Sequence, residues 1–285
     1  MADLISVIVA TYNRADALDA VLRSLADQTD RDFEVVVADD GSDTKTAEVI
    51  GGSLDRMPVP LRHVWHEDRG FRLAEIRNRA IRVSTGSYCV FLDGDCLARP
   101  GFVAAHRALA VRGWFVTGNR VLLSPTFTHS LLRHRLPVHR WGIERWIGRR
   151  FRGDINRIAP LCRVPLGPLR GRQATHWLGA RGSNMAFWRD DLDRVDGFDA
   201  AFEGWGREDS DIFVRMIRSG VRRKDGRFST GVLHLWHPEA DRSRLEANER
   251  HLLDAVREGR VRAVCGLSSL VEDTKRASGF EQECA

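Results

Sequence analysis

The chain has 285 residues, of which 43% are hydrophobic and 29% are charged, with a formal net charge of +5; this composition is typical of a soluble globular protein. No apolar run approaches the roughly 18 residues of a membrane-spanning helix, and the start, Met1-Ala2-Asp3, shows neither a basic nor a cleavable apolar segment, so we expect a cytoplasmic protein. The five cysteines are odd in number and lack a Cys-x-x-Cys spacing, which argues against a disulfide framework and a structural zinc site.

The first half of the chain alternates predicted strands and predicted helices. Buried apolar runs predict strands at residues 4–10, 33–38, 61–65 and 88–92. A helix capped by Asn13 is expected after the first strand, and further helices are expected at 44–50 and 73–83. Alternation at this spacing predicts an α/β fold, in which helices cover both faces of a parallel sheet.

The second half of the chain resumes with a strand predicted at 184–187. The stretch Gly204-Trp205-Gly206-Arg207-Glu208-Asp209 then precedes a helix predicted at 212–219. Asp209 would sit just before the helix N-terminus, whose dipole favours an ionised carboxylate. A further, charged helix is expected over residues 244–258.

Between these halves lies a basic segment, residues 129–172. It holds eleven arginines against Glu144 and Asp154, a net charge of +9, which leaves −4 for the rest of the chain. Tryptophans and other apolar residues are interleaved with the arginines. Such a segment on a slightly acidic body suggests an anionic surface as partner. The alternative is an insertion that is merely solvated.

Two carboxylates follow the strand predicted at 88–92, in Asp93-Gly94-Asp95. Ligands of open α/β sheets bind at the carboxyl edge of the strands. A pair of acids there can hold a divalent cation that also carries phosphate oxygens; the alternative is a capped turn without a metal. The first strand is followed by no Gly-x-Gly-x-x-Gly and the sequence has no Gly-Lys-Ser/Thr loop, which argues against a dinucleotide enzyme and a P-loop NTPase.

An aromatic residue and a second pair of acids stand at neighbouring strand ends. The first strand ends in Thr11-Tyr12-Asn13, and the second ends in Asp39-Asp40. A ring that stacks and a carboxylate that accepts an N–H would suit a nucleobase. The alternative is that Tyr12 packs locally and Asp40 caps the following helix.

Together these motifs resemble the GT-A glycosyltransferases of family 2. The resemblance rests on motifs that occur in the same order and spacing: residues 6–14, Gln28-Thr29, residues 33–42, Arg77-Asn78 and Asp93-Gly94-Asp95. In the second half, residues 204–209 are similar to the acceptor-side motif of β-1,4-galactosyltransferases and chondroitin polymerases. The resemblance implies a GT-A fold, with a Rossmann-like nucleotide-binding sheet and a smaller acceptor-side portion.

The resemblance also implies a role for each matching residue. The donor-binding residues would be Thr11, Tyr12, Asn13, Asp40, Arg77 and Asp93. The acceptor-binding residues would be Trp205, Gly206 and Glu208, with Asp209 as the catalytic base. Asp95 would bind Mn²⁺ or Mg²⁺ together with His234, and His237 is the alternative to His234 as ligand.

The implied activity is that of an inverting, metal-dependent glycosyltransferase. A UDP-sugar would supply a hexose or N-acetylhexosamine to a hydroxyl of a glycan or glycolipid acceptor, as in the synthesis of cell-surface polysaccharide or lipopolysaccharide. Residues 129–172 would hold the protein at the inner membrane face as a peripheral protein, and no nucleic-acid partner is expected. Two alternatives remain open: a sugar-phosphate nucleotidyltransferase, and a non-enzymatic polyanion-binding protein.

The same resemblance divides the chain into a catalytic domain and a tail. The GT-A catalytic domain would span residues 1–240. Its three parts would be a nucleotide-sugar half at 1–123, a basic insertion at 124–176 and an acceptor half at 177–240. The charged tail would occupy residues 241–285.

Overall fold

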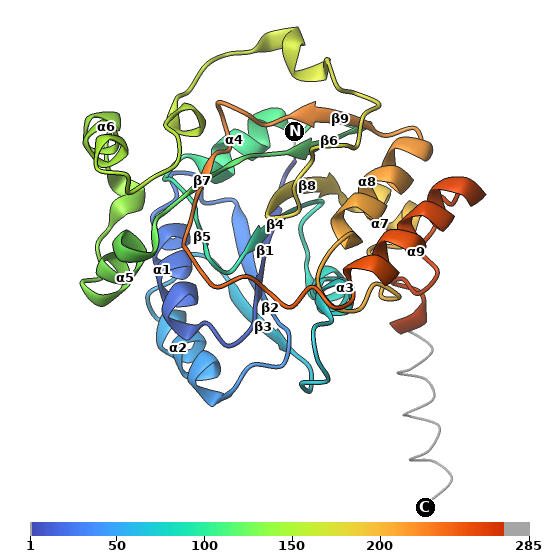
Figure 1. Cartoon of the computed structure of the whole chain (residues 1–285), viewed down its shortest axis with the longest axis horizontal. Helices are drawn as coiled ribbons and strands as arrows, with labels where there is room; N and C mark the ends of the chain where they lie inside the picture. The colour runs from blue at the N-terminus through green and yellow to red at the C-terminus, as the bar shows by residue number, and fades with distance from the viewer. Residues whose placement is uncertain (1, 271–285) are drawn as a thin grey trace, which may run out of the picture.

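The computed structural model describes residues 2–270, and a seven-stranded sheet of order β3-β2-β1-β4-β8-β6-β9 forms its centre (Figure 1). The strands are β1 (Ile5–Thr11), β2 (Phe33–Asp39), β3 (Leu61–Trp65), β4 (Tyr88–Asp93), β6 (Trp114–Thr117), β8 (Asn184–Trp188) and β9 (Arg222–Asp225). The predicted α/β fold is confirmed. The part of the predicted tail beyond residue 270 lies outside the described residues.

Helices cover both faces of the sheet because its strands alternate two sets of buried side chains. On one face, Val7 and Val9 pack with α1 and α2. On the other face, Ile8 and Phe91 pack with α3, α7 and α8. The helices of the described chain have these bounds: α1 (Ala15–Ala26), α2 (Thr44–Leu54), α3 (Leu73–Val83), α4 (Phe102–Leu109), α5 (Pro125–Arg133), α6 (Ile143–Phe151), α7 (Arg189–Val195), α8 (Glu208–Arg218) and α9 (Leu245–Glu258).

The prediction of a parallel sheet is right for β1 to β4 and wrong for β8. β8 pairs antiparallel with both β4 and β6. Asn184, the first residue of β8, pairs with Leu92 near the end of β4. The chain therefore re-enters the sheet at the carboxyl edge of β4, where Asp93 N donates to Ser183 O at 3.3 Å.

Two predictions at helix starts are also wrong. Asn13 does not cap α1: its backbone has φ = 48°, and its Oδ1 accepts a hydrogen bond from Asp43 N at 2.9 Å. α8 begins at Glu208, so Asp209 lies within the first turn and not before it. The left-handed backbone of Arg207, with φ = 79°, starts this helix earlier than its apolar pattern indicates.

A small second sheet supports the loop after β4. It consists of β5 (Cys96–Leu97), β10 (Val232–His234) and β7 (Arg120–Leu122), with β10 in the middle. Just past β10, Leu235 N donates to Asp95 O at 2.9 Å. This sheet brings the end of β10 next to the predicted metal-binding loop.

The basic insertion is docked on the body of the protein. α5 and α6 lie beyond α1 at the left of Figure 1. Trp146 of α6 is fully buried in the same core as the apolar face of α1. Arg135 pairs with Asp19 at 2.9 Å, and Arg140 pairs with Asp27 at 2.5 Å. The alternative of a merely solvated insertion is therefore wrong.

Truncation of Trp146 should destabilise the whole protein. Trp146→Ala should lower the free energy of unfolding by about 3–5 kcal/mol, because it removes a buried indole and leaves a cavity. Urea unfolding followed by circular dichroism measures this change. Phe151→Ala on the same helix is the control: its ring is 88% exposed, so a change below about 0.5 kcal/mol is expected. Equal effects of the two substitutions would contradict the docked arrangement.

Candidate active site

The carboxyl ends of β1, β2 and β4 meet at one edge of the sheet. Asp40, directly after β2, donates its backbone N–H to Thr11 O at 3.0 Å. Gly94, directly after β4, donates its N–H to Ala10 O at 2.6 Å. A Cβ on Gly94 would lie 2.7 Å from that oxygen, so the close approach of this loop to β1 requires glycine. The predicted donor-binding and metal-binding segments are thereby brought together.

Tyr12 and Asp40 form the predicted nucleobase end of this edge. Tyr12 is exposed, and its hydroxyl donates to Asp68 Oδ2 at 2.9 Å. Asp40 is buried, and both of its carboxylate oxygens are hydrogen-bonded to the segment that follows β3. The cap of α2 is Asp43, whose side chain accepts from Lys45 N. The alternative that Asp40 caps that helix is therefore wrong.

Thr11 and Asn13 flank Tyr12 in different ways. Thr11 Oγ1 is buried and has no hydrogen-bond partner among residues 2–270. Asn13 donates its backbone N–H to Ser42 Oγ at 2.9 Å, in addition to its bond with Asp43. The Thr11 hydroxyl thus lies buried beside the loop after β4, whereas Asn13 fastens the end of β1 to the start of α2.

Arg77 lies buried between two carboxylates. Its Nη2 donates to Asp93 Oδ1 at 3.2 Å, and its Nη1 lies 3.6 Å from Glu208 Oε1. Burial raises the pKa of Asp93 in spite of Arg77, and the charges of Asp95 and Asp209 raise it further. Burial, followed by repulsion from Asp209, raises the pKa of Glu208 to about 7. The acids predicted for metal, donor and acceptor therefore act on one another electrostatically.

Asp209 is held in the first turn of α8 by the turn that leads into β8. Its Oδ2 accepts from Gly182 N at 2.8 Å, and a Cβ on Gly182 would lie 2.8 Å from the Asp209 Cβ. The Gly-Trp-Gly motif is required here because Gly204 and Gly206 have φ of 73° and 108°. Trp205, between them, is exposed. The predicted acceptor residues thus stand immediately before the predicted base.

Asp95, His234 and His237 form a cluster whose ligand atoms all lie within 4.8 Å of one another. His234 Nε2 is 3.6 Å from Asp95 Oδ1, and His237 Nε2 is 3.3 Å from Asp95 Oδ2. Burial lowers the pKa of His234 to about 4, so its imidazole is neutral and can coordinate. Asp93 and Asp95 form a second group with Cys96, but burial raises the pKa of this thiol and leaves it a poor ligand. One carboxylate and two imidazoles fit a divalent transition metal.

Sequence reasoning missed His66 and Asp68, both of which contact predicted site residues. His66 and Asp68 follow β3 and come beside Asp40 and Tyr12 because β3 pairs with β2. The turn-like Asp68-Arg69-Gly70 was the one local signal that could have pointed to this segment. For His66 the sequence carries no such signal, whereas Gly182 belongs to the glycine-containing stretch 179–184, whose glycines permit a close backbone approach.

Comparison with known proteins agrees with this geometry. Residues 6–167 match the family described as Glycosyl transferase family 2, and residues 172–237 match the N-terminal domain of galactosyltransferase. Validoxylamine A glucosyltransferase of Streptomyces hygroscopicus subsp. jinggangensis is 34% identical over 242 residues, which cover 80% of this chain and 55% of that protein. Chondroitin synthase of Escherichia coli is 28% identical over 243 residues, 76% of this chain and 33% of the synthase. The chain spans about half or less of the length of these relatives.

Two solved structures share the fold. The mannosyltransferase PcManGT from Pyrobaculum calidifontis, in complex with GDP-Man and Mn²⁺, superposes with a TM-score of 0.60 at 22% identity, covering 90% of this chain and 64% of its own. Residues 1–349 of S. aureus TarS, in complex with UDP, also give 0.60, at 15% identity, covering 93% and 68%. These likenesses confirm the expected GT-A fold. Since the family match extends over residues 6–167, more than half of the chain, the protein belongs to glycosyl transferase family 2.

Proposed function

We propose that this enzyme is an inverting, metal-dependent glycosyltransferase that moves a hexose or N-acetylhexosamine from a UDP-sugar to a hydroxyl of a glycan acceptor. Family membership supports sugar transfer from a nucleotide sugar, and it argues against the nucleotidyltransferase and non-enzymatic alternatives. The observation that carries the proposal is the position of Asp209. This acceptor-side carboxylate is close enough to Asp93 and Glu208 to raise the pKa of both.

The residues at the nucleobase end support a uridine nucleotide. Uracil offers one ring N–H and a flat face, which suit the Asp40 carboxylate and the exposed Tyr12 ring. TarS has been solved with UDP and with UDP-GlcNAc. PcManGT has been solved with GDP-Man, so the choice of uracil rests on Tyr12 and Asp40 and not on the fold.

The cluster of Asp95, His234 and His237 would hold the divalent cation. When bound, such a cation acts as a Lewis acid that stabilises the charge on the leaving diphosphate. A mixed oxygen and nitrogen ligand set suits Mn²⁺ better than Mg²⁺, which prefers oxygen ligands alone. Asp93, paired with the buried Arg77, would face the donor between this cluster and the proposed catalytic base, Asp209.

Asp209 would act as the catalytic base. It would take the proton of the acceptor hydroxyl while the hydroxyl oxygen bonds to the anomeric carbon and the bond from that carbon to the diphosphate breaks. The hydrogen bond from Gly182 N to its Oδ2 and its place in the first turn of α8 fix the orientation of the Asp209 carboxylate. Glu208, with a pKa of about 7, is suited to hydrogen-bond the acceptor instead. Attack from the face opposite the leaving group inverts the anomeric configuration.

The acceptor would be lipid-linked, and α6 would rest on the membrane that carries it. Ile143, Ile147 and Phe151, spaced four residues apart on α6, are exposed by 38%, 43% and 88%. Arg150 and Arg152, beside this apolar stripe, have no ion-pair partner in the described part of the chain. An apolar stripe with adjacent positive charge fits an anionic lipid surface. None of the helices within residues 2–270 is both long and apolar enough to cross a bilayer.

Asp209→Asn should abolish transfer and leave donor binding intact. The asparagine carbonyl can still accept the hydrogen bond from Gly182 N but cannot take a proton, so kcat should fall by about 10²–10⁴-fold. A transfer assay and calorimetry with UDP measure the two properties. Asp190→Asn, at an exposed acid in the first turn of α7, is the control. Normal turnover of Asp209→Asn would rule out the proposed base.

Removal of the metal or its ligands should weaken donor binding. In Mn²⁺, Asp95→Ala and His237→Ala should each raise the Kd of UDP by about tenfold or more, because the diphosphate loses its cation. EDTA should bring the wild-type enzyme to the same level. His176→Ala, at an exposed histidine, is the control. UDP binding that does not respond to EDTA would refute metal dependence.

Charges placed on the stripe of α6 should release the protein from membranes. The wild-type protein should sediment with phosphatidylglycerol vesicles, and the double variant Ile147→Glu/Phe151→Glu should bind about tenfold more weakly. Val264→Glu is the control, since Val264 is exposed and follows α9 in the sequence; α9 and α6 lie on opposite sides of Figure 1. Equal sedimentation of the three proteins would overturn membrane docking and leave the proposed sugar transfer untouched.

A further inference from the structure

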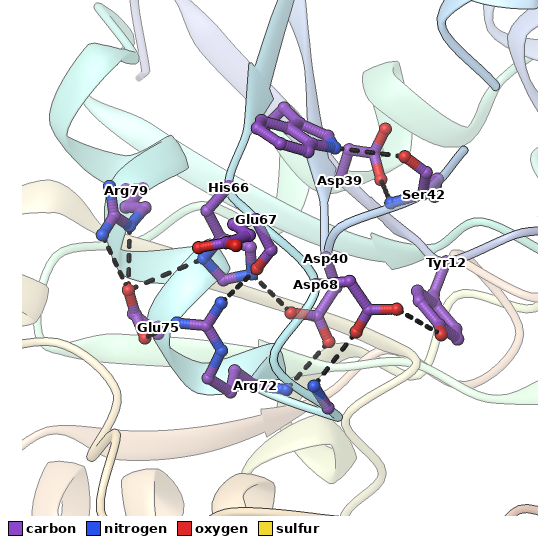
Figure 2. A network of polar contacts seen from close by, with 12 residues as sticks. Tyr12, Asp39, Asp40, Ser42, His66, Glu67, Asp68, Arg72, Glu75 and Arg79 are labelled. Carbon is purple, nitrogen blue, oxygen red and sulfur yellow. Dashed lines mark hydrogen bonds and ion pairs between the residues drawn. The ribbon is translucent and has the colours of Figure 1, made fainter. Parts of the chain in front are cut away.

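A polar network links α3 to the predicted nucleobase site through the imidazole of His66 (Figure 2). His66 follows β3 and is buried. Its Nε2 lies 2.6 Å from Oδ1 of Asp40, and its Nδ1 lies 3.6 Å from Oε1 of Glu75, slightly too far for a direct hydrogen bond. The ring therefore separates two carboxylates, one of which is the proposed base-binding acid.

Both carboxylates are also held from other directions. The second oxygen of Asp40 accepts from the backbone N–H of Arg72 at 2.9 Å. Glu75 accepts from Arg72 Nη1 at 2.8 Å and from Arg79 Nη2 at 2.8 Å. The His66 ring thus lies between Glu75 of α3 and Oδ1 of Asp40 and connects the two.

The surroundings of His66 match its doubly protonated form. Nδ1 is buried and faces the Glu75 carboxylate, with no other polar partner within residues 2–270. A lone pair on Nδ1 would therefore meet a negative charge. Burial lowers the pKa of His66, but the contacts with Asp40 and then Glu75 outweigh burial and leave the pKa above its ordinary value. Glu75 stays ionised, because His66 first, and then Arg79 and Arg72, lower its pKa to about 2.

Charged groups from three segments act on this imidazole. They are Asp40 at the end of β2, Asp68 in the segment after β3, and Arg72 and Glu75 at the start of α3. Arg72 disfavours the imidazolium, whereas the three carboxylates favour it. Because both ring nitrogens face carboxylate oxygens, these charges together stabilise the protonated imidazole of His66.

We propose that His66 is a positioning residue for the donor: its imidazolium fixes the Asp40 carboxylate toward the nucleobase and makes nucleotide affinity depend on pH. This role rests on the proposed binding of the base by Asp40. While His66 is protonated, a charge-assisted hydrogen bond holds Oδ1 of Asp40. As the pH rises through the pKa of His66, Nδ1 loses its proton and turns a lone pair toward Glu75; Nε2–H still donates to Asp40, but this hydrogen bond is no longer charge-assisted and holds the carboxylate less tightly.

The Kd of UDP as a function of pH tests this role. Calorimetry in Mn²⁺ between about pH 5.5 and 8.5 should show wild-type affinity falling by about fivefold or more as His66 loses its proton. His66→Gln can donate one hydrogen bond to Asp40 but cannot titrate. Its affinity should be lower at acid pH and should lack this decrease. Ionisation of UDP and of the metal ligands is common to both proteins and cancels in the ratio of their Kd values.

Two further variants separate positioning from a purely structural role. His63→Gln removes the neighbouring histidine of β3. The His63 imidazole contacts Asp39, at 3.0 Å, instead of Asp40, so this variant should show the wild-type dependence of the Kd of UDP on pH. Glu75→Gln leaves the imidazole in place but removes one of its carboxylates, so the decrease in affinity should move to lower pH. Thermal melting reports whether each variant is folded.

Retention of the wild-type profile by His66→Gln, or an unmoved midpoint in Glu75→Gln, would overturn the role of His66. Asp40→Ala distinguishes this failure from failure of the donor site. If Asp40→Ala weakens UDP binding and His66→Gln does not, the proposed donor site is supported and the proposed role of His66 is refuted. If Asp40→Ala binds UDP as tightly as the wild-type enzyme does, both the binding of the base by Asp40 and the role of His66 are refuted.

Discussion

Repulsion among carboxylates at the carboxyl edge of the central sheet is the constraint on which the rest of the structure depends. Burial first, and then the charges of Asp95 and Asp209, raise the pKa of Asp93; burial first, and then Asp209 and Asp93, raise that of Glu208. Arg77, buried between Asp93 and Glu208, opposes both increases. Such a concentration of like charge lowers the stability of the protein without its ligands. A bound cation and a hydroxyl that gives up its proton would each relieve the repulsion, which is why these acids suit transfer chemistry.

The first half of the fold could be predicted because its signals are local. The strand predicted at 61–65 and the helix predicted at 73–83 have those bounds in the structure. The orientation of β8 could not be predicted, because its pairing with β4 depends on the path of the insertion and not on the apolar run itself. The cap predicted at Asn13 failed for a similar reason, since its partner Asp43 lies beyond the next strand.

Some residues of the candidate site could likewise be predicted from the sequence, and others could not. Asp40 and Asp95 could be located because each acid follows a buried strand, and strand ends of parallel sheets share one edge. His66 could not be located, and His237 could be named only as an alternative to His234. An imidazole acquires a function only from the groups around it, and His66 lies beside Asp40 because β3 pairs with β2. Gly182 could be located only in part: the glycines of residues 179–184 indicate a close backbone approach, but the hydrogen bond from Gly182 N to Asp209 does not follow from the sequence.

The basic insertion, predicted at residues 124–176, begins and ends near the candidate active site. Just before it, Leu123 N donates to His234 O at 2.9 Å, and just after it, Gly182 N reaches Asp209. The entropic cost of closing a loop grows slowly with its length. A segment of different length could therefore join these two anchor points if it kept the packing that Trp146 makes in the core. Related chains could differ in much of this segment and still bring the same acids together at the edge of the sheet.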